Sequence, residues 1–268
     1  MNPQQIVPFE PDAECESTQS NVIPEQEPLQ ESLQETLPTT VQPTRVPEAK
    51  TRLRIRFTKC GDLRWISHRD LARVWERLLR RAGLQLAFSQ GFHPKPKISF
   101  PSALALGIEA LEEVVEVEVL GGIDLLSIGD VLRREMPSGM TLLELRALQT
   151  ALGKAKVLGA TYRIEHRCDP HSYSVEELQK RIEEIRLLPQ LALQRDDKII
   201  VCNTSDPYFD LKIEGEYFVF ALPTVAQGSI RPSELLAHVG LGSLLEDGWT
   251  LQRTAVHLLD DEPPPTTT

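Results

Sequence analysis

The chain has 268 residues, and at roughly 150 residues per domain this length suggests one large domain or two small ones. With 41% hydrophobic and 25% charged residues, the composition is typical of a soluble globular protein. No stretch approaches the roughly 18 to 20 apolar residues of a membrane helix, the N-terminus lacks a secretion signal, and the net charge of −10 taken alone argues against nucleic acid. We therefore expect a cytoplasmic protein with no membrane partner.

The negative charge is distributed unevenly along the chain. Residues 1–50 carry 9 acidic and 2 basic residues, a net charge of −7, and residues 154–268 carry 18 acidic and 12 basic residues, a net charge of −6. Residues 51–153 carry 15 basic and 12 acidic residues, and 12 of those basic residues fall within 51–100. A basic region therefore lies between two acidic ones.

Both ends of the chain have the composition of disordered segments. Residues 1–49 are rich in Pro, Gln, Glu, Ser and Thr and contain a single aromatic residue, Phe9. Such a segment cannot bury enough apolar surface to offset the entropy cost of ordering it. We predict a disordered acidic arm over 1–49 and a disordered tail over 260–268.

The region after the arm switches between strand and helix periodicity. Residues Arg52 to Phe57 alternate arginine with apolar side chains, which predicts a half-buried strand. Ser67 opens a helix with Asp70 at the capping-box position, and Gly83 is placed to end it. The predicted elements that follow are strands at Leu84–Phe88, Lys97–Ala103 and Val115–Leu120, a helix at Leu125–Met136 and a strand at Thr141–Leu148.

The second half of the chain presents a similar order of elements. The predicted strands are Thr161–His166, Leu191–Gln194, Lys198–Val201, Tyr217–Leu222 and Trp249–Leu258, with helices opened by Ser174 and running from Ser233 to Val239. We predict an α+β fold of two tandem ferredoxin-like (split β-α-β) domains, over 50–153 and 154–259. The join falls near residues 149–156.

The most distinctive segment is the run FSQGFHPKPKISF from Phe88 to Phe100. Two prolines stiffen an extended backbone, and a glycine permits a sharp turn. Such a loop is suited to holding an anion, with one aromatic side chain available for stacking. The candidate binding residues of the loop are Ser89, Gln90, Gly91, Phe92, His93, Lys95 and Lys97. The alternative is a stiff connection between strands with no ligand.

The helix opened by Ser67 carries arginines on the side opposite its apolar stripe. Such a surface could contact phosphates or an acidic partner, and the alternative is an ordinary solvated face. The candidate binding residues of the helix are Ser67, His68, Arg73, Arg77, Arg80 and Arg81.

The arginines of the first predicted strand could also contact phosphates, because RNA-recognition proteins bind RNA on the open face of their sheet. That face carries stacking aromatics in such proteins, whereas here it carries Arg52, Arg54 and Arg56. In the predicted topology these arginines lie across from Glu116 and Glu118, so cross-strand ion pairs are the favoured interpretation.

Enzyme signals are few. The sequence has no P-loop, no G-x-G-x-x-G, no G-x-S-x-G and no H-E-x-x-H, and its four cysteines are scattered without metal-ligand spacing. His68 and His93 could form an acid–base pair, although caps or ligand contacts are the commoner roles of such histidines. We predict no cofactor, no metal and no catalytic residue for this chain.

Four segments resemble a bacterial family known as radical-SAM-linked or radical-SAM-associated proteins. They are Ile66–Leu71 (ISHRDL), Arg80–Gly83 (RRAG), Phe88–Phe100 and Leu106–Glu109 (LGIE). Family members occur alone or fused behind a cobalamin-binding radical S-adenosylmethionine enzyme, so the resemblance implies an accessory module that serves such an enzyme. This chain lacks the C-x-x-x-C-x-x-C triplet that holds a [4Fe–4S] cluster, so the enzyme would be a separate chain.

These observations lead to two main hypotheses. The first is a non-catalytic accessory protein that docks to a separate radical S-adenosylmethionine enzyme or presents an anionic substrate, such as RNA, to it. The second is an independent RNA-binding or RNA-processing protein. A structural interaction module without a ligand is a third alternative.

Overall fold

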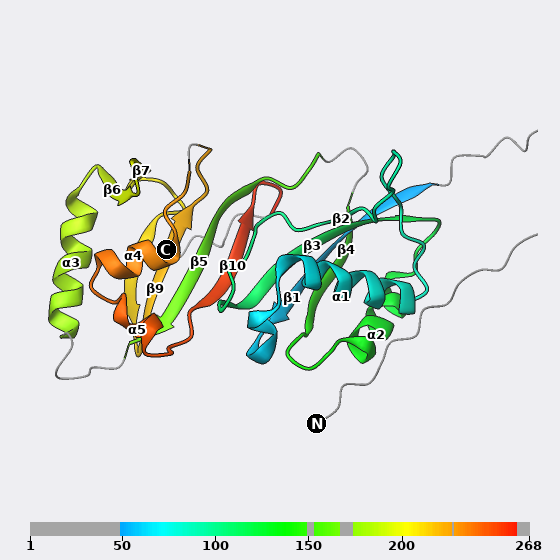
Figure 1. Ribbon diagram of the computed structural model, residues 1–268, viewed down its shortest axis with the longest axis horizontal. Helices are drawn as coiled ribbons and strands as arrows, with labels where there is room; N and C mark the ends of the chain where they lie inside the picture. Colours follow the sequence, from blue (N-terminus) through cyan, green and yellow to red (C-terminus); the bar gives the residue numbers. More distant parts are fainter. Residues whose placement is uncertain (1–48, 149–152, 167–173, 227, 262–268) are drawn as a thin grey trace, which may run out of the picture. The chain divides into compact units, whose positions relative to one another are not determined.

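The computed structural model describes residues 49–148, 153–166, 174–226 and 228–261. The predicted acidic arm, apart from its last residue, and the end of the predicted tail lie outside these residues, as does residue stretch 149–152 of the predicted join. All of these described residues belong to one compact unit. The fold is mixed α+β, with a core formed mainly by β-sheet and a few helices (Figure 1).

The first half contains four strands and two α-helices. Its elements are β1 (Lys50–Lys59), a 3-10 turn (Gly61–Trp65), α1 (His68–Arg81), β2 (Ile98–Ser99), β3 (Glu109–Leu120), α2 (Leu125–Glu135) and β4 (Leu142–Leu148). The alternation in β1 sends Leu53, Ile55 and Phe57 into a core with the apolar stripe of α1, and all three are fully buried. Ser67 caps α1, because its hydroxyl oxygen accepts the backbone N–H of Asp70 at 3.2 Å.

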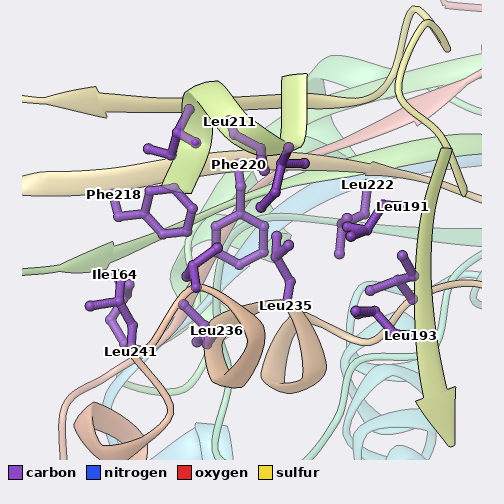
Figure 2. Close-up of a cluster of buried hydrophobic side chains, with 14 of the residues drawn as sticks. Ile164, Leu191, Leu193, Leu211, Phe218, Phe220, Leu222, Leu235, Leu236 and Leu241 are labelled. Carbon is purple, nitrogen blue, oxygen red and sulfur yellow. The ribbon is translucent and has the colours of Figure 1, made fainter. Parts of the chain in front are cut away.

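The described residues of the second half form six strands and three helices. Its elements are β5 (Val157–Glu165), α3 (Val175–Leu187), β6 (Gln190–Arg195), β7 (Lys198–Asn203), β8 (Asp210–Glu214), β9 (Tyr217–Pro223), α4 (Pro232–His238), α5 (Ser243–Glu246) and β10 (Gln252–Leu258). Its core gathers side chains from β5, β8, β9 and the helices, with Phe218 and Phe220 stacked at 5.2 Å between ring centroids (Figure 2).

One sheet runs through both halves. Its strand order is β4-β1-β3-β10-β5-β9-β8, with β2 paired to β3 beside this path. The halves meet where β10 pairs in parallel with β3, with Gln252 opposite Glu109 and Arg253 opposite Ala110. Strands β6 and β7 form a separate hairpin outside the main sheet.

Two predicted strands of the first half are shorter than expected. Residues 84–88 form no strand and contribute only isolated bridges, Leu86 to Val119 and Phe88 to Pro96. The strand predicted at Lys97–Ala103 is reduced to Ile98–Ser99. Pro96 and Pro101 explain the second result, because they flank this short strand and proline has no N–H to donate to a strand ladder.

The second half also differs from its prediction. The segment Asp210–Glu214, expected only as a separator, is strand β8 and pairs with β9 through a tight turn at Gly215, whose φ is +58°. The two strands expected at 191–194 and 198–201 belong to the outlying hairpin instead. Alternation of apolar and polar residues predicts a strand but not the strand with which it pairs. This explains why the arrangement of these strands differs from the prediction. The division into two domains at residue 153 stays a prediction.

The cross-strand pairing predicted for the arginines of β1 is confirmed. Arg54 lies opposite Glu116 in the register of β1 and β3, and its Nη2 is 2.7 Å from Glu116 Oε1. Arg52 is paired with the same carboxylate, whereas Glu118 is paired with Lys97 instead. The charges of Arg52 and Arg54 are therefore neutralised by a carboxylate on the same face of the sheet.

The chain extends this charge network beyond β10. Asp260, predicted to lie in the disordered tail, bonds both terminal nitrogens of Arg54 at 2.9 and 2.7 Å. Asp261 pairs with Arg56 at 2.7 Å and with Arg146 at 3.1 Å. Arg54 is only 1% exposed, so the two aspartates help to close the sheet face over it.

The pairing of Asp260 predicts an acid-sensitive contribution to stability. Burial alone would raise the pKa of Asp260, but the hydrogen bonds and charge of Arg54 outweigh it and hold that pKa below its usual value. A carboxylate with a lowered folded-state pKa stabilises above its unfolded pKa of about 4, and this contribution is lost as the pH falls further. In urea titrations, the stability difference between wild type and Asp260→Asn should be largest at pH 6 and shrink below pH about 4.

The matched control for that titration is Asp130→Asn, because Asp130 is 75% exposed in its pair with Arg133. Its stability difference from wild type should stay small at every pH. A difference for Asp260→Asn that does not change with pH would show that its pairing with Arg54 contributes nothing.

Candidate functional site

Helix α1 presents two chemically different sides. Leu71, Trp75, Leu78 and Leu79 are buried against the sheet. The opposite side exposes a row of basic residues, which are Arg69, Arg73, Arg77, Arg80 and Arg81. The predicted separation of an apolar and a basic side is therefore present.

The basic side of α1 is partly neutralised by acids. Arg73 pairs with Asp70 at 3.0 Å, Arg80 with Glu76 at 2.9 Å and Arg81 with Glu135 at 3.4 Å. Within the described part of the chain, Arg69 and Arg77 form no salt bridge. These two cations are consequently the members of the row most available to an external anion.

The segment between α1 and β2 is a narrow projecting loop. Its base is closed by the Ser89 N–H donating to the Lys95 carbonyl at 2.9 Å and by the Lys95 N–H donating to Ser89 Oγ at 3.0 Å. Gly91 at the turn has φ +125°, a conformation that favours glycine. Figure 1 shows this segment extending beyond the sheet.

The tip of the loop carries exposed aromatic and basic side chains. Gln90, Phe92, His93 and Lys95 are all exposed, and Phe92 is as exposed as a residue in an extended peptide, at 102%. A phenylalanine side chain that remains in water in the folded protein gains none of the roughly 1.5–3 kcal/mol that its burial would provide. An aromatic side chain held outward in this way is available to a partner.

The loop and the basic side of α1 adjoin each other. The Arg80 guanidinium lies over the Phe88 ring, 5.9 Å from its centroid. Lys97, at the other end of the loop, is held by Glu118 at 2.6 Å. The structure thus brings the C-terminal end of the basic side of α1 beside the loop, whereas Ser67 and His68 lie at the other end of the helix, and Lys97 serves as an anchor of the loop.

The two histidines of the candidate set have separate surroundings. His68, in the first turn of α1, packs edge-on against Phe100 with 4.9 Å between ring centroids. His93 lies in the projecting loop, which follows the opposite end of α1. The structure does not bring the two imidazoles together as an acid–base pair.

Neither described cysteine has the properties of a reactive thiolate. Burial raises the pKa of the Cys202 thiol to about 11, and burial followed by the nearby Glu109 carboxylate raises that of Cys60. Cys15 and Cys168 lie outside the described residues. The described ranges also contain no group of three His, Cys, Asp or Glu side chains arranged to hold a metal ion, and no helix there is long and apolar enough to cross a membrane.

Sequence reasoning missed a buried cluster of charges where the halves meet. Arg253 of β10 is ion-paired with Glu113 of β3, and both are at most 1% exposed. Lys59 at the end of β1 is 2% exposed, and burial lowers its pKa although Glu113 opposes that effect. No local pattern marks these residues, because their burial depends on the pairing of β3 with β10, which only the folded chain brings about.

Comparison with known proteins places the chain in a family. The model of a family described as uncharacterized proteins conserved in bacteria (DUF2344) matches residues 52–226, and the chain belongs to that family. The match includes α1 and the projecting loop. A search of curated proteins found no match.

Two solved structures resemble the chain weakly. One is a protein of unknown function from Galdieria sulphuraria, with 9% identity, a TM-score of 0.26, and coverage of 79% of this chain and 99% of that chain. The other is a candidate glycine cleavage system transcriptional repressor, with 9% identity, a TM-score of 0.23 and the same coverage.

Proposed function

We propose that the chain is a non-catalytic accessory protein that binds single-stranded RNA through α1 and the loop from Gln90 to Lys95, and presents it to a separate radical S-adenosylmethionine enzyme. The observation that carries the proposal is the fully exposed Phe92 at the tip of a braced loop, beside the basic side of α1. Stacking platforms flanked by cations are the usual means of holding single-stranded nucleic acid.

The chemistry of this surface suits a nucleotide chain. Phe92 offers a ring for one base, and Lys95, Arg69 and Arg77 offer charges for phosphates. The loop is stiffened by Pro94 and Pro96, so little conformational entropy is lost when it binds.

The fold supports the loop, rather than the sheet face, as the binding surface. We interpret each half as a ferredoxin-like unit, because the order β4-β1-β3-β2 recurs in the second half as β10-β5-β9-β8. In RNA-recognition proteins of related topology the open sheet face binds the bases. Here Arg54 on that face is buried under Glu116 and Asp260, so the face offers an RNA no available cation at this position.

The enzyme partner in the proposal rests on the resemblance of the four motif segments to radical-SAM-linked proteins. Two of those segments, Arg80–Gly83 and Phe88–Phe100, form the end of α1 and the projecting loop. A substrate held there would be held next to the part of the chain that carries the family resemblance.

The first test is the salt dependence of RNA binding. The double variant Arg69→Gln/Arg77→Gln should bind a labelled single-stranded RNA more weakly and reduce the salt slope by about 1.4, at about 0.7 per lost phosphate contact. The matched control is Lys180→Gln/Lys198→Gln, which removes two exposed charges from the second half. An unchanged slope in the first variant would exclude α1 as a phosphate-binding surface.

The second test concerns the enzyme partner. Affinity-tagged wild-type protein should capture from cell extract a chain that contains iron and acid-labile sulfide in a 1:1 ratio, as a [4Fe–4S] cluster requires. Repeated capture without iron and sulfide would contradict the role as an accessory to such an enzyme, even if RNA binding were observed.

A further inference from the structure

A cavity of about 290 Å³ lies where the two halves meet. One wall comes from the loop Pro101–Ala103 of the first half, and the others come from β5, β9 and the segment that follows β9. Most of the lining is apolar, including Val157, Leu222 and Ile230. This volume lies just below the roughly 300–1,000 Å³ of most ligand sites, so only a small molecule would fit.

The hydroxyl of Ser102 on the first wall is backed by a buried cation. Arg253 Nη1 donates to Ser102 Oγ at 2.9 Å and to the Ala103 carbonyl at 3.3 Å. A hydroxyl that accepts from a guanidinium is polarised, which makes its own O–H a stronger donor. Ser102 lines the cavity, so this proton is available to a ligand there.

Ser229, on another wall, also has a hydroxyl group whose oxygen already accepts a hydrogen bond. Its Oγ accepts the backbone N–H of Val225 at 2.9 Å, which leaves the O–H to donate. Tyr162 and Thr224 also line the cavity. The described residues that line the cavity include no acidic or basic side chain.

The charges behind Ser102 favour an anion. Lys59, Arg253 and Glu113 form a buried group of two basic residues and one acidic residue. Arg253 Nε is buried and has no hydrogen-bond partner among the described residues. Because basic residues outnumber acidic ones in this group, its electrostatic energy falls when a negatively charged ligand approaches the Ser102 hydroxyl.

We propose that this cavity binds a small organic carboxylate with an aliphatic body. The hydroxyls of Ser102 and Ser229 donate to the carboxylate, and the apolar lining packs around the carbon chain. Among the described residues that line the cavity no carboxylate is present to pair with an ammonium group, which disfavours an amine. Occupancy would connect the loop of the first half with β5 and β9 of the second.

The test is isothermal titration calorimetry of the full chain with 4-methylpentanoate at pH 7. We expect saturable 1:1 binding, and binding of 4-methylpentan-1-amine at least about tenfold weaker, because the amine carries the same body and the opposite charge. Ser102→Ala and Ser229→Ala should each weaken carboxylate binding by about tenfold. Ser127→Ala, on α2, is the control and should leave it unchanged.

Several results would overturn the proposal. These are the absence of saturable binding, equal binding of the amine, or carboxylate affinity that survives both serine substitutions. Ser102→Ala removes a hydrogen bond of the buried Arg253 and can also lower stability; Ser229→Ala removes only the bond from the Val225 backbone N–H, touches no buried charge, and keeps the test valid in that case. None of these outcomes depends on Phe92 or α1, so the RNA proposal is tested separately.

Discussion

Replacing Arg54 by methionine is expected to lower the free energy of unfolding by about 3–5 kcal/mol, because it leaves a buried carboxylate without its main partner. Arg54 and Glu116 are 1% and 2% exposed, and four hydrogen bonds of 2.7–2.9 Å join Arg54 to Glu116 Oε1 and to Asp260. The substitution keeps most of the side-chain volume, so the decrease in the free energy of unfolding measures the contribution of the charge and its hydrogen bonds. Urea unfolding followed by circular dichroism measures the effect.

Two further variants separate the charge effect from packing. Arg54→Met/Glu116→Leu removes both charges, and it should recover part of the lost stability, because a buried ion pair can often be replaced by apolar side chains. Arg133→Met removes an exposed pair, with Arg133 59% exposed, and should stay within the scatter of the measurement. A loss at Arg54 no larger than at Arg133 would contradict the role of the network.

Replacing Trp75 by alanine should have a comparably large effect. Trp75 is 0% exposed and packs edge-on against Phe57 of β1, with 4.8 Å between ring centroids and an interplanar angle of 71°. Large-to-small substitutions of buried aromatic residues cost about 3–5 kcal/mol, through lost contacts and the cavity that remains. The same urea titrations would detect the change.

Trp75→Phe is the matched control. The indole Nε1 is buried without a hydrogen-bond partner among the described residues, so phenylalanine removes a polar group that gains nothing there. We expect a distinctly smaller loss than for alanine. Equal losses for the two variants would mean that the volume of the ring does not determine the stability of the core beneath α1.

The elements of the first half could be predicted from sequence because local patterns determine them. The alternation from Arg52 to Phe57, the cap at Ser67 and the glycine at 83 each act within a few residues, and the structure confirms all three. The pairing of Arg54 with Glu116 was predictable as well, because it follows from placing β1 beside β3.

The errors lie where structure depends on distant parts of the chain. Nothing in the segment from Asp210 to Glu214 indicates that it, rather than the strands before it, pairs with β9. The burial of Arg253 with Glu113 likewise depends on the meeting of β10 and β3, 140 residues apart in sequence. The pairing of Arg81 with Glu135 of α2 also depends on distant parts of the chain, whereas the pairs of Arg73 with Asp70 and of Arg80 with Glu76 follow from helical spacing.

The candidate surface was only partly predictable. The proline and glycine positions indicated a stiff loop, but they did not indicate that Phe92 would project fully into solvent. A phenylalanine between glycine and histidine could equally have folded into the core. Exposure is a property of the tertiary structure, and here it distinguishes a binding loop from a plain connection.

The most direct test of the account is the affinity of Phe92→Ala for single-stranded RNA, measured by fluorescence anisotropy at constant salt. Loss of one base-stacking ring costs about 1–3 kcal/mol, so the account predicts a dissociation constant about 5 to 150 times that of wild type. Leu187→Ala, which removes another exposed apolar side chain, 86% exposed on α3, should bind as wild type does. Equal affinities of wild type and Phe92→Ala would contradict the proposed function.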